Sequence, residues 1–292
     1  MHQSRVPDLL GAHVSTQGGV HTAPARGTAI GATAIQVFTK TPNQWREPSI
    51  TEETRAAFRQ ELERSGISSI VAHDSYLINL ASPDPVLHAR STASFLAELE
   101  RCESLGIPFI VSHPGNFIED REMGLVRNAA AYTHCLQTAP GRVTVLLETT
   151  AGTGTALGST FEELHALRER IGEGVRHRIG FCADTCHLFS AGYDLAADFD
   201  GVWRRWEETI GLAHLRCLHL NDSKTAFASR RDRHQLIGEG SLGREPFRRI
   251  MTDPRFAGVM KIIETPKGDD KVTLDRRMLR RLRRYASATP PR

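Results

Sequence analysis

Nine side chains along this sequence are of the types that bind divalent metal ions, and their placement is regular. Six short apolar runs each carry at least one of these histidine, aspartate or glutamate residues near the C-terminal end, one of them carries two, and a polar segment adds two more. The nine residues are His73, His113, Glu148, Asp184, His187, His219, Asp232, His234 and Glu264. Imidazole and carboxylate groups are the usual protein ligands of zinc and similar ions. One such residue alone would be ordinary, but the repeated placement predicts a metal site.

The number of candidate ligands exceeds what one ion can use. A four-coordinate zinc takes three or four protein ligands, so nine residues suit two or three ions with at least one shared carboxylate. Glu148, Asp184, Asp232 and Glu264 carry four negative charges, whereas three divalent ions would carry six positive charges. The filled site would be positive, and it would suit an anionic substrate, especially a phosphodiester.

Short runs rich in Val, Ile, Leu and Phe would position these ligands. Their starts lie 23 to 44 residues apart, and continuous apolar runs of this length are typical of strands buried on both faces. The eight runs are Leu9–Ser15, Ala32–Thr39, Ser69–Ser75, Phe109–Gly115, Val143–Thr150, Ile179–His187, Leu215–Asp222 and Val259–Pro266. Helical patterns lie between them. The sequence therefore predicts an α/β fold, a single (β/α)8 TIM barrel with its metal site at the C-terminal ends of the strands.

The alternating helices show apolar stripes and capping residues. They are predicted over Glu52–Arg64, over Pro85–Leu105 with Gly106 as C-cap, from a cap at Ser159 or Thr160 to Ile171, and over Val272–Tyr285. We expect residues 1–292 to form one domain, with strand–helix units from about 9 to 286 and a short disordered tail over 287–292. The rival fold, an open doubly wound sheet, would carry a glycine-rich phosphate turn after its first strand, and GAHVSTQGGV lacks that pattern.

The composition, with 40% hydrophobic and 24% charged residues, is that of a soluble globular protein. No segment approaches the roughly 20 apolar residues of a membrane span, and the N-terminus has no signal-peptide core, so we expect a cytoplasmic protein. Five cysteines without paired spacing fit a reducing compartment. Residues 271–292 hold eight basic residues against one acidic residue. This segment could bind a polyanion, but we interpret it as a solvated helix face.

A series of motifs between Gly11 and Pro266 resembles the endonuclease IV family of apurinic/apyrimidinic endonucleases. The motifs are GAHVSTQGG, FTKTPNQW, HDSYLINLASP, SHPG, ETTAG, DTCH, HLNDSK, SRRDRH, GEGSLG and IIETP. The resemblance implies a base-excision-repair enzyme that cuts the phosphodiester on the 5′ side of abasic sites in duplex DNA. It would leave 3′-hydroxyl and 5′-deoxyribose phosphate ends, with a side activity on blocked 3′ ends. We expect it to act as a monomer.

The same resemblance implies how three zinc ions per chain, or Mn²⁺ at one or more sites, share the candidate ligands. One ion would take His73, His113 and Glu148, a second would share Glu148 and add Asp184, His219 and Glu264, and the third would take His187, Asp232 and His234. Glu148 and Glu264 are the expected catalytic residues, since as ligands they would orient an attacking hydroxide between the first two ions.

Residues for DNA contact are expected at the mouth of the barrel. Tyr76 and Leu77 follow the candidate ligand His73 and match the family's loop that fills the stack left by the abasic nucleotide. Asn43 stands where some members have an arginine that enters the base stack. His13 ends the first strand, and we interpret it as packing against the site rather than as a ligand.

Two other functions are compatible with parts of this pattern. A sugar isomerase or epimerase could use a related metal barrel, but it would need fewer ligands and would have no use for a third set made of His187, Asp232 and His234. A non-catalytic DNA-binding module could keep the fold, and its simplest sign would be the loss of a bridging ligand. All nine candidate ligands are present, so the nuclease is the favoured interpretation.

Overall fold

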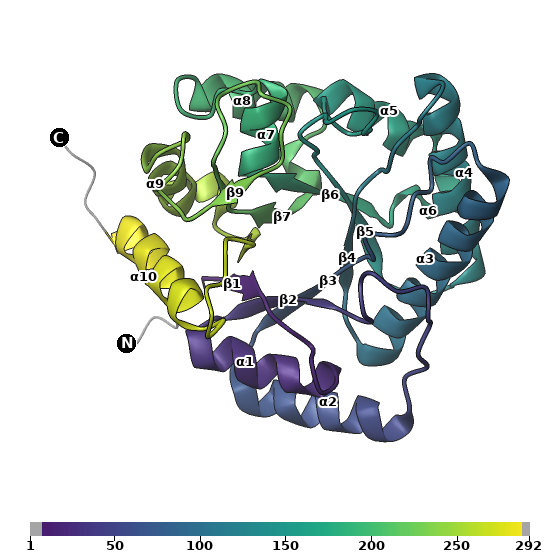
Figure 1. Cartoon of the computed structure of the whole chain (residues 1–292), viewed down its shortest axis with the longest axis horizontal. Coiled ribbons are helices and arrows are strands. Elements are labelled where there is room, and N and C mark those ends of the chain that lie inside the picture. Colours follow the sequence, from purple (N-terminus) through teal and green to yellow (C-terminus); the bar gives the residue numbers. More distant parts are fainter. Residues whose placement is uncertain (1–7, 288–292) are drawn as a thin grey trace.

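The computed structural model describes residues 8–287, and its centre is a closed barrel of eight parallel strands (Figure 1). The barrel strands are β1 (Leu10–His13), β2 (Ala34–Phe38), β3 (Ser69–His73), β4 (Phe109–Ser112), β5 (Thr144–Glu148), β6 (Ile179–Asp184), β7 (Leu215–His219) and β10 (Met260–Ile263). Each strand pairs in parallel with the next along the chain, and β1 pairs with β10 to close the ring. The predicted TIM barrel is confirmed.

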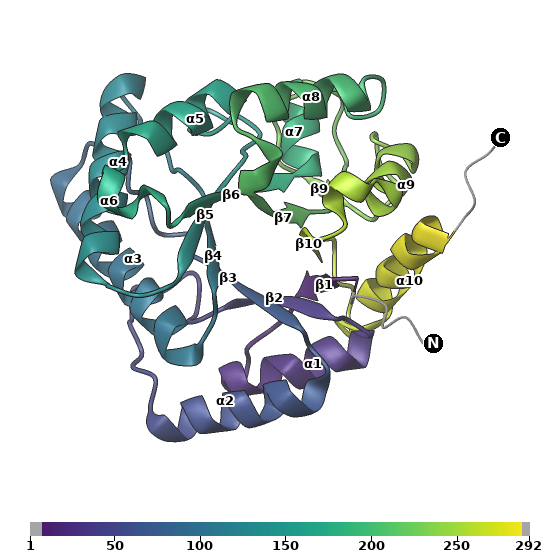
Figure 2. The same cartoon turned by 180° about the vertical axis from the view of Figure 1, so that it is seen from behind.

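Helices follow the strands and cover the outside of the barrel, as both views show (Figures 1 and 2). The helices are α1 (Ala23–Ile30), α2 (Glu52–Ser65), α3 (Pro85–Leu105), α4 (Arg121–Thr138), α5 (Phe161–Arg170), α6 (Glu173–Arg176), α7 (Thr185–Ala191), α8 (Phe199–Thr209), α9 (Glu245–Thr252) and α10 (Thr273–Ser287), with 3-10 turns η1 (Val20–Thr22), η2 (Leu212–His214) and η3 (Pro254–Phe256). A small antiparallel sheet of β8 (Asp222–Ser223) and β9 (His234–Gln235) follows β7. The predicted C-cap Gly106 ends α3 in the left-handed conformation, with φ 71°.

Apolar side chains pack on both sides of the barrel wall, which is why the strands read as continuous apolar runs. In β5, Leu146 belongs to a cluster inside the barrel, whereas Val145 and Leu147 belong to the larger core beneath the helices. The inner cluster consists of Ala34, Val71, Val111, Leu146, Cys182, Cys217, Met260 and Ile262. The interior of the barrel is therefore filled by side chains, and a site at the carboxyl ends of the strands lies above this packed layer.

Every barrel strand ends earlier than its predicted apolar run, and at β6 the difference matters for the site. We expected His187 at the end of the strand, but β6 ends at Asp184 and His187 lies in α7. The Asp184 carboxylate accepts a hydrogen bond of 2.9 Å from the His187 backbone N–H. Because this bond caps a helix, the chain leaves the sheet directly after Asp184.

The basic C-terminal segment forms α10, which lies outside the barrel beside α1 and α9 (Figure 1). Leu279 and Leu282 are buried, while Arg280 and Arg284 are exposed, as expected of a solvated helix face. Ser287, predicted to begin the tail, is the last helical residue, and residues 288–292 lie outside the described part of the chain. Within residues 8–287, no helix has both the length and the apolar character that crossing a membrane requires.

Candidate metal centre

The nine candidate ligands lie at one end of the barrel, the end where the strands finish. His73, Glu148, Asp184 and His219 are the last residues of β3, β5, β6 and β7, and His113 and Glu264 directly follow β4 and β10. The others come from outside the barrel wall: His187 from α7, His234 from β9 and Asp232 from the segment before β9. Parallel strands bring residues far apart in the sequence to one rim.

Three groups of these residues place their ligand atoms within 4.8 Å of one another. The first set is His73, His113 and Glu148, the second set is Glu148, Asp184, His219 and Glu264, and the third set is His187, Asp232 and His234. Their membership coincides with that implied by the family resemblance. Ligand atoms of Asp184, Cys186 and His234 also lie within 4.8 Å of one another, so Asp184 lies close to the third set as well as in the second.

Glu148 lies at the centre of the site and is fully buried. Its Oε2 lies 3.3 Å from Nε2 of both His73 and His113, and its Oε1 lies 2.8 Å from Nδ1 of His219. Burial raises the pKa of Glu148, but the surrounding histidines, His219 first, outweigh burial and hold the pKa well below its ordinary value. One oxygen therefore faces the first set and the other faces the second, as a shared carboxylate ligand requires.

The charges of the site favour a bound cation. Nδ1 of His219 faces Oε1 of Glu148 at 2.8 Å and Oε2 of Glu264 at 3.3 Å. Burial lowers the pKa of His219, but the carboxylates of Glu264 and Glu148 raise it well above its ordinary value. Two carboxylates around one ring nitrogen attract either a proton or a metal ion into the space between them. The donor atoms of the three sets are nitrogen and oxygen, without sulfur, and such a donor set fits zinc or Mn²⁺.

Three of the histidines have one ring nitrogen held by a backbone carbonyl oxygen. Nδ1 of His73 donates to the carbonyl oxygen of Asp74 at 2.9 Å. Nδ1 of His187 donates to that of Thr149 at 2.8 Å, and Nδ1 of His234 donates to that of Glu264 at 3.2 Å. This contact leaves Nε2 of each ring for a ligand, which is the common arrangement of metal-binding histidines. Nε2 of His234 faces Oδ1 of Asp232 at 3.0 Å without forming a hydrogen bond, so its lone pair is available for a metal.

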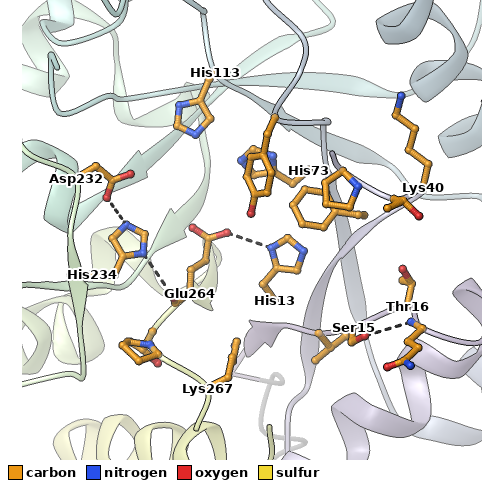
Figure 3. Close-up of a pocket in the computed structure, with 18 of the residues that line it drawn as sticks. His13, Ser15, Thr16, Lys40, His73, His113, Asp232, His234, Glu264 and Lys267 are labelled. Atoms are coloured by element: carbon orange, nitrogen blue, oxygen red, sulfur yellow. Dashed lines mark hydrogen bonds and ion pairs between the residues drawn. The ribbon is translucent and has the colours of Figure 1, made fainter. Parts of the chain in front are cut away.

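A cleft of about 740 Å³ opens above these residues (Figure 3). Members of all three sets line it, together with polar and basic side chains of the rim such as Thr16 and Lys267. Glu148, Asp184 and His219 lie beneath the cleft and are fully buried. The site is thus open enough for a polymer to approach and deep enough to shield its charged floor.

The structure places the predicted DNA-contacting residues differently with respect to this cleft. Tyr76 lines it, with its side chain 70% exposed and its ring 5.1 Å from that of Phe38 in an edge contact. Leu77 is half-buried next to it. Asn43 is exposed in the loop after β2, where its neighbour Pro42 lines the cleft.

That loop after β2 is anchored by ionic contacts to buried basic side chains. Lys40, which is 5% exposed, donates to Ser94 of α3 at 2.8 Å and pairs with Glu47. Arg101 of α3 binds the other oxygen of Glu47 at 2.6 Å. The chain on both sides of Asn43 is therefore fixed to α3.

Three polar residues that support the site escaped the sequence analysis. Gln36 of β2 contacts His219 and Glu264, each at 2.7 Å. Asn221 donates to Asp184 at 2.6 Å and accepts from the Glu264 backbone N–H at 2.8 Å. Thr149 accepts from the Asp184 backbone N–H at 2.9 Å. A polar residue inside an apolar run, such as the glutamine in AIQVF, was the available signal. His13 contacts Glu264 at 3.2 Å and lies outside the three sets, which agrees with a supporting position.

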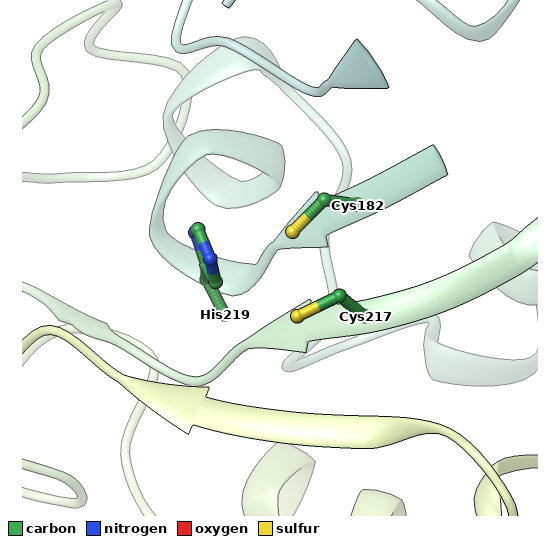
Figure 4. A group of neighbouring side chains, drawn as sticks. All are labelled: Cys182, Cys217 and His219. Carbon is green, nitrogen blue, oxygen red and sulfur yellow. The ribbon is translucent and has the colours of Figure 1, made fainter. Parts of the chain in front are cut away.

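Two cysteines lie directly below the centre. Cys182 of β6 and Cys217 of β7 are partners in the sheet register, and their sulfur atoms lie within 4.8 Å of a ring nitrogen of His219 (Figure 4). Both are fully buried in the inner cluster, like the other three cysteines in the core. They pack as small apolar side chains.

The fold and the site together define the class of this protein. A family model described as Xylose isomerase-like TIM barrel matches residues 25–285. The endonuclease IV of Thermus thermophilus matches with a TM-score of 0.84 and 34% identity, over 94% of this chain and 98% of that chain. A D-tagatose 3-epimerase-like protein matches with a TM-score of 0.69 but 15% identity, over 95% of this chain and 98% of that chain, which shows the fold alone.

Proteins with higher sequence identity to this chain show the family to which it belongs. A protein of Geobacter sulfurreducens is 49% identical over 267 residues, which are 90% of this chain and 90% of the relative. A protein of Chloroflexus aggregans is 47% identical over 265 residues, which are 89% of this chain and 92% of the relative. Both are named "Probable endonuclease 4". The chain belongs to the endonuclease IV family.

Proposed function

We propose that this protein is a deoxyribonuclease of DNA repair that hydrolyses the phosphodiester on the 5′ side of abasic sites in duplex DNA. Three ligand sets that meet under one open cleft are the observation that carries the proposal. The family membership supports it, because the relatives are named endonucleases. We assign one zinc ion to each set, with Mn²⁺ as an alternative, and a further activity on blocked 3′ ends.

The three ligand sets are connected by carboxylates. The first and second sets share Glu148, so any movement of this carboxylate affects both. The third set is built from residues outside the barrel wall and is joined to the second by Asp184, which also caps α7 below His187. Divalent ions at such sites supply positive charge for the phosphate oxygens. They also lower the pKa of water, so that hydroxide is available as the nucleophile near neutral pH.

The bond changes follow from hydrolysis at phosphorus. The oxygen of water bonds to phosphorus, and the bond from phosphorus to the 3′ oxygen of the preceding nucleotide breaks. The 3′ oxygen gains a proton and becomes a hydroxyl group, while the phosphate stays on the 5′ carbon of the abasic deoxyribose. No side-chain nucleophile is needed, so the roles of this chain's residues are to bind the ions and hold the substrate.

The surface beside the cleft fits the backbone of DNA. Lys224, Arg230, Arg231 and Arg233 are exposed in the segment that joins β8 to β9. Arg231 and Arg233 line a second hollow of about 600 Å³ that shares His113, His187 and Asp232 with the site. Positive side chains in this position would contact phosphates and hold the strand in register over the metal centre.

Cleavage of a defined duplex tests the proposal. The substrate is a labelled duplex with one tetrahydrofuran abasic analogue, and the control is the same duplex without the lesion. We expect incision directly 5′ to the analogue, a 3′ end that a polymerase extends, and loss of both after treatment with chelator. Metal-loaded protein that leaves the lesion duplex intact would refute the proposal. A second duplex with a 3′-phosphate end tests the further activity on blocked ends.

A further inference from the structure

Gln36 lies beneath the second set, in the middle of β2, and both ends of its side-chain amide contact the site. It is fully buried. Its Oε1 lies 2.7 Å from Nε2 of His219, and its Nε2 lies 2.7 Å from Oε1 of Glu264 and 3.0 Å from Nδ1 of His13. A buried amide is costly unless its polar atoms are paired. These contacts therefore account for a glutamine in an otherwise apolar strand.

The neighbours of this amide determine which way it faces. A carboxylate accepts hydrogen bonds and cannot donate them, so the NH2 group of Gln36 must face Glu264. The carbonyl oxygen then faces His219. Because this oxygen can only accept, the hydrogen between the two groups belongs to Nε2 of the imidazole. Nδ1 of His219, which faces Glu148 and Glu264 at 2.8 and 3.3 Å, is then the nitrogen whose lone pair points into the second set.

We propose that Gln36 is a positioning residue of the metal centre. Its carbonyl keeps the hydrogen on Nε2 of His219, so that Nδ1 is the ligand atom, and its NH2 group fixes one oxygen of Glu264. This inference rests on the proposed function, since it concerns the cation held by the second set. It goes beyond that function because it assigns the control of two ligands to a residue that binds no metal itself.

The support that Gln36 gives His219 differs from the support of three other candidate ligand histidines. For His73, His187 and His234 the supporting acceptor is a backbone carbonyl, which no substitution removes. For His219 it is a side chain. Supporting partners of metal ligands usually contribute about ten- to a hundredfold to metal affinity. Substitution of Gln36 can therefore measure this contribution to metal affinity.

Metal retention by the variant Gln36→Met tests the proposal. Methionine has a similar length and volume but makes neither hydrogen bond, and Gln137→Met, at an exposed position of α4, is the matched control. Metal-loaded proteins are dialysed against graded chelator and the retained ions are counted by elemental analysis. We expect Gln36→Met to lose the ion of the second set at about ten- to a hundredfold lower chelator concentration than wild type or control, while the other ions are retained. Equal retention by all three proteins would overturn the proposal.

A spectroscopic measurement on the wild-type protein covers the case in which Gln36→Met does not fold. Nitrogen-15 chemical shifts of the His219 ring distinguish a nitrogen that carries hydrogen from one that binds a metal. We expect hydrogen on Nε2 and none on Nδ1 in the metal-loaded protein, and the opposite assignment would overturn the proposal. If wild-type protein retains no metal at all, the proposed function fails as well. If it retains metal and cleaves the abasic duplex, a negative result concerns Gln36 alone.

Discussion

Replacement of Tyr76 by alanine should weaken binding to abasic duplex DNA while the fold stays intact. Extrusion of a nucleotide costs a few kcal/mol, and least where the base is already missing. An aromatic ring that stacks in the vacated place returns about 1–3 kcal/mol, so its loss should raise Kd about ten- to a hundredfold. In the free protein the Tyr76 side chain is 70% exposed. Since full burial of such a side chain contributes about 1.5–3 kcal/mol, the part buried here contributes less than about 1 kcal/mol to stability.

The assay is fluorescence anisotropy with a duplex that holds one abasic analogue and a phosphorothioate at the scissile position, which slows cleavage during the titration. Tyr76→Phe keeps the ring and should bind like wild type. Val86→Ala, at an apolar position of α3 that is 76% exposed, is the control for loss of exposed apolar surface. Metal content is measured for each protein. If Tyr76→Ala binds the abasic duplex as tightly as wild type, the ring is packing on Phe38 and the stacking residue must be sought elsewhere.

Other predictions concern the metal ions and the basic helix. Protein purified without chelator should contain about three zinc-like ions per chain by elemental analysis, and fully active protein with one ion or fewer would refute the three-set interpretation. Glu148→Gln should lower the cleavage rate by more than about a hundredfold, beyond the effect of an outer-shell partner, and by more than His113→Ala or Glu264→Gln, because Glu148 belongs to two sets. Near-wild-type turnover of Glu148→Gln at low added metal would contradict a shared ligand. Arg280→Glu with Arg284→Glu should change the salt dependence of DNA binding little, because both residues are exposed on α10, a helix that lies outside the barrel (Figure 1). A slope smaller by several units would place α10 in the DNA interface.

The barrel could be predicted from the sequence because each strand is buried on both faces and therefore reads as a continuous apolar run. The candidate ligand positions followed from the same pattern, since six of the eight runs carry a candidate histidine, aspartate or glutamate ligand near their C-terminal ends. His187 was misplaced because capping depends on one hydrogen bond, from its backbone N–H to Asp184. A run of apolar letters does not reveal where such a bond turns the chain into a helix.

The supporting contacts were beyond reach for a different reason. Gln36 and Glu264 are 228 residues apart in the sequence, and no local pattern indicates which distant side chain a buried amide meets. The buried lysine at position 40 is a similar case, because its partners Glu47 and Ser94 are brought to it by the path of the loop over α3. Periodicity reports which face of an element is buried, whereas these contacts depend on how elements approach one another.

The order of the ligands along the chain has a consequence for how the centre comes into being during synthesis. The first set is supplied by β3, β4 and β5, three consecutive strands that are neighbours in the barrel. The second set is incomplete without Glu264, which follows β10. Glu264 contacts His13, at the end of β1, where the pairing of β1 with β10 closes the barrel, and the two residues are 251 apart in the sequence. Contacts so far apart form late in folding, because the entropy of a long chain must be lost first. We therefore expect the candidate metal centre to be completed only after β10 has been synthesised and has paired with β1 to close the barrel.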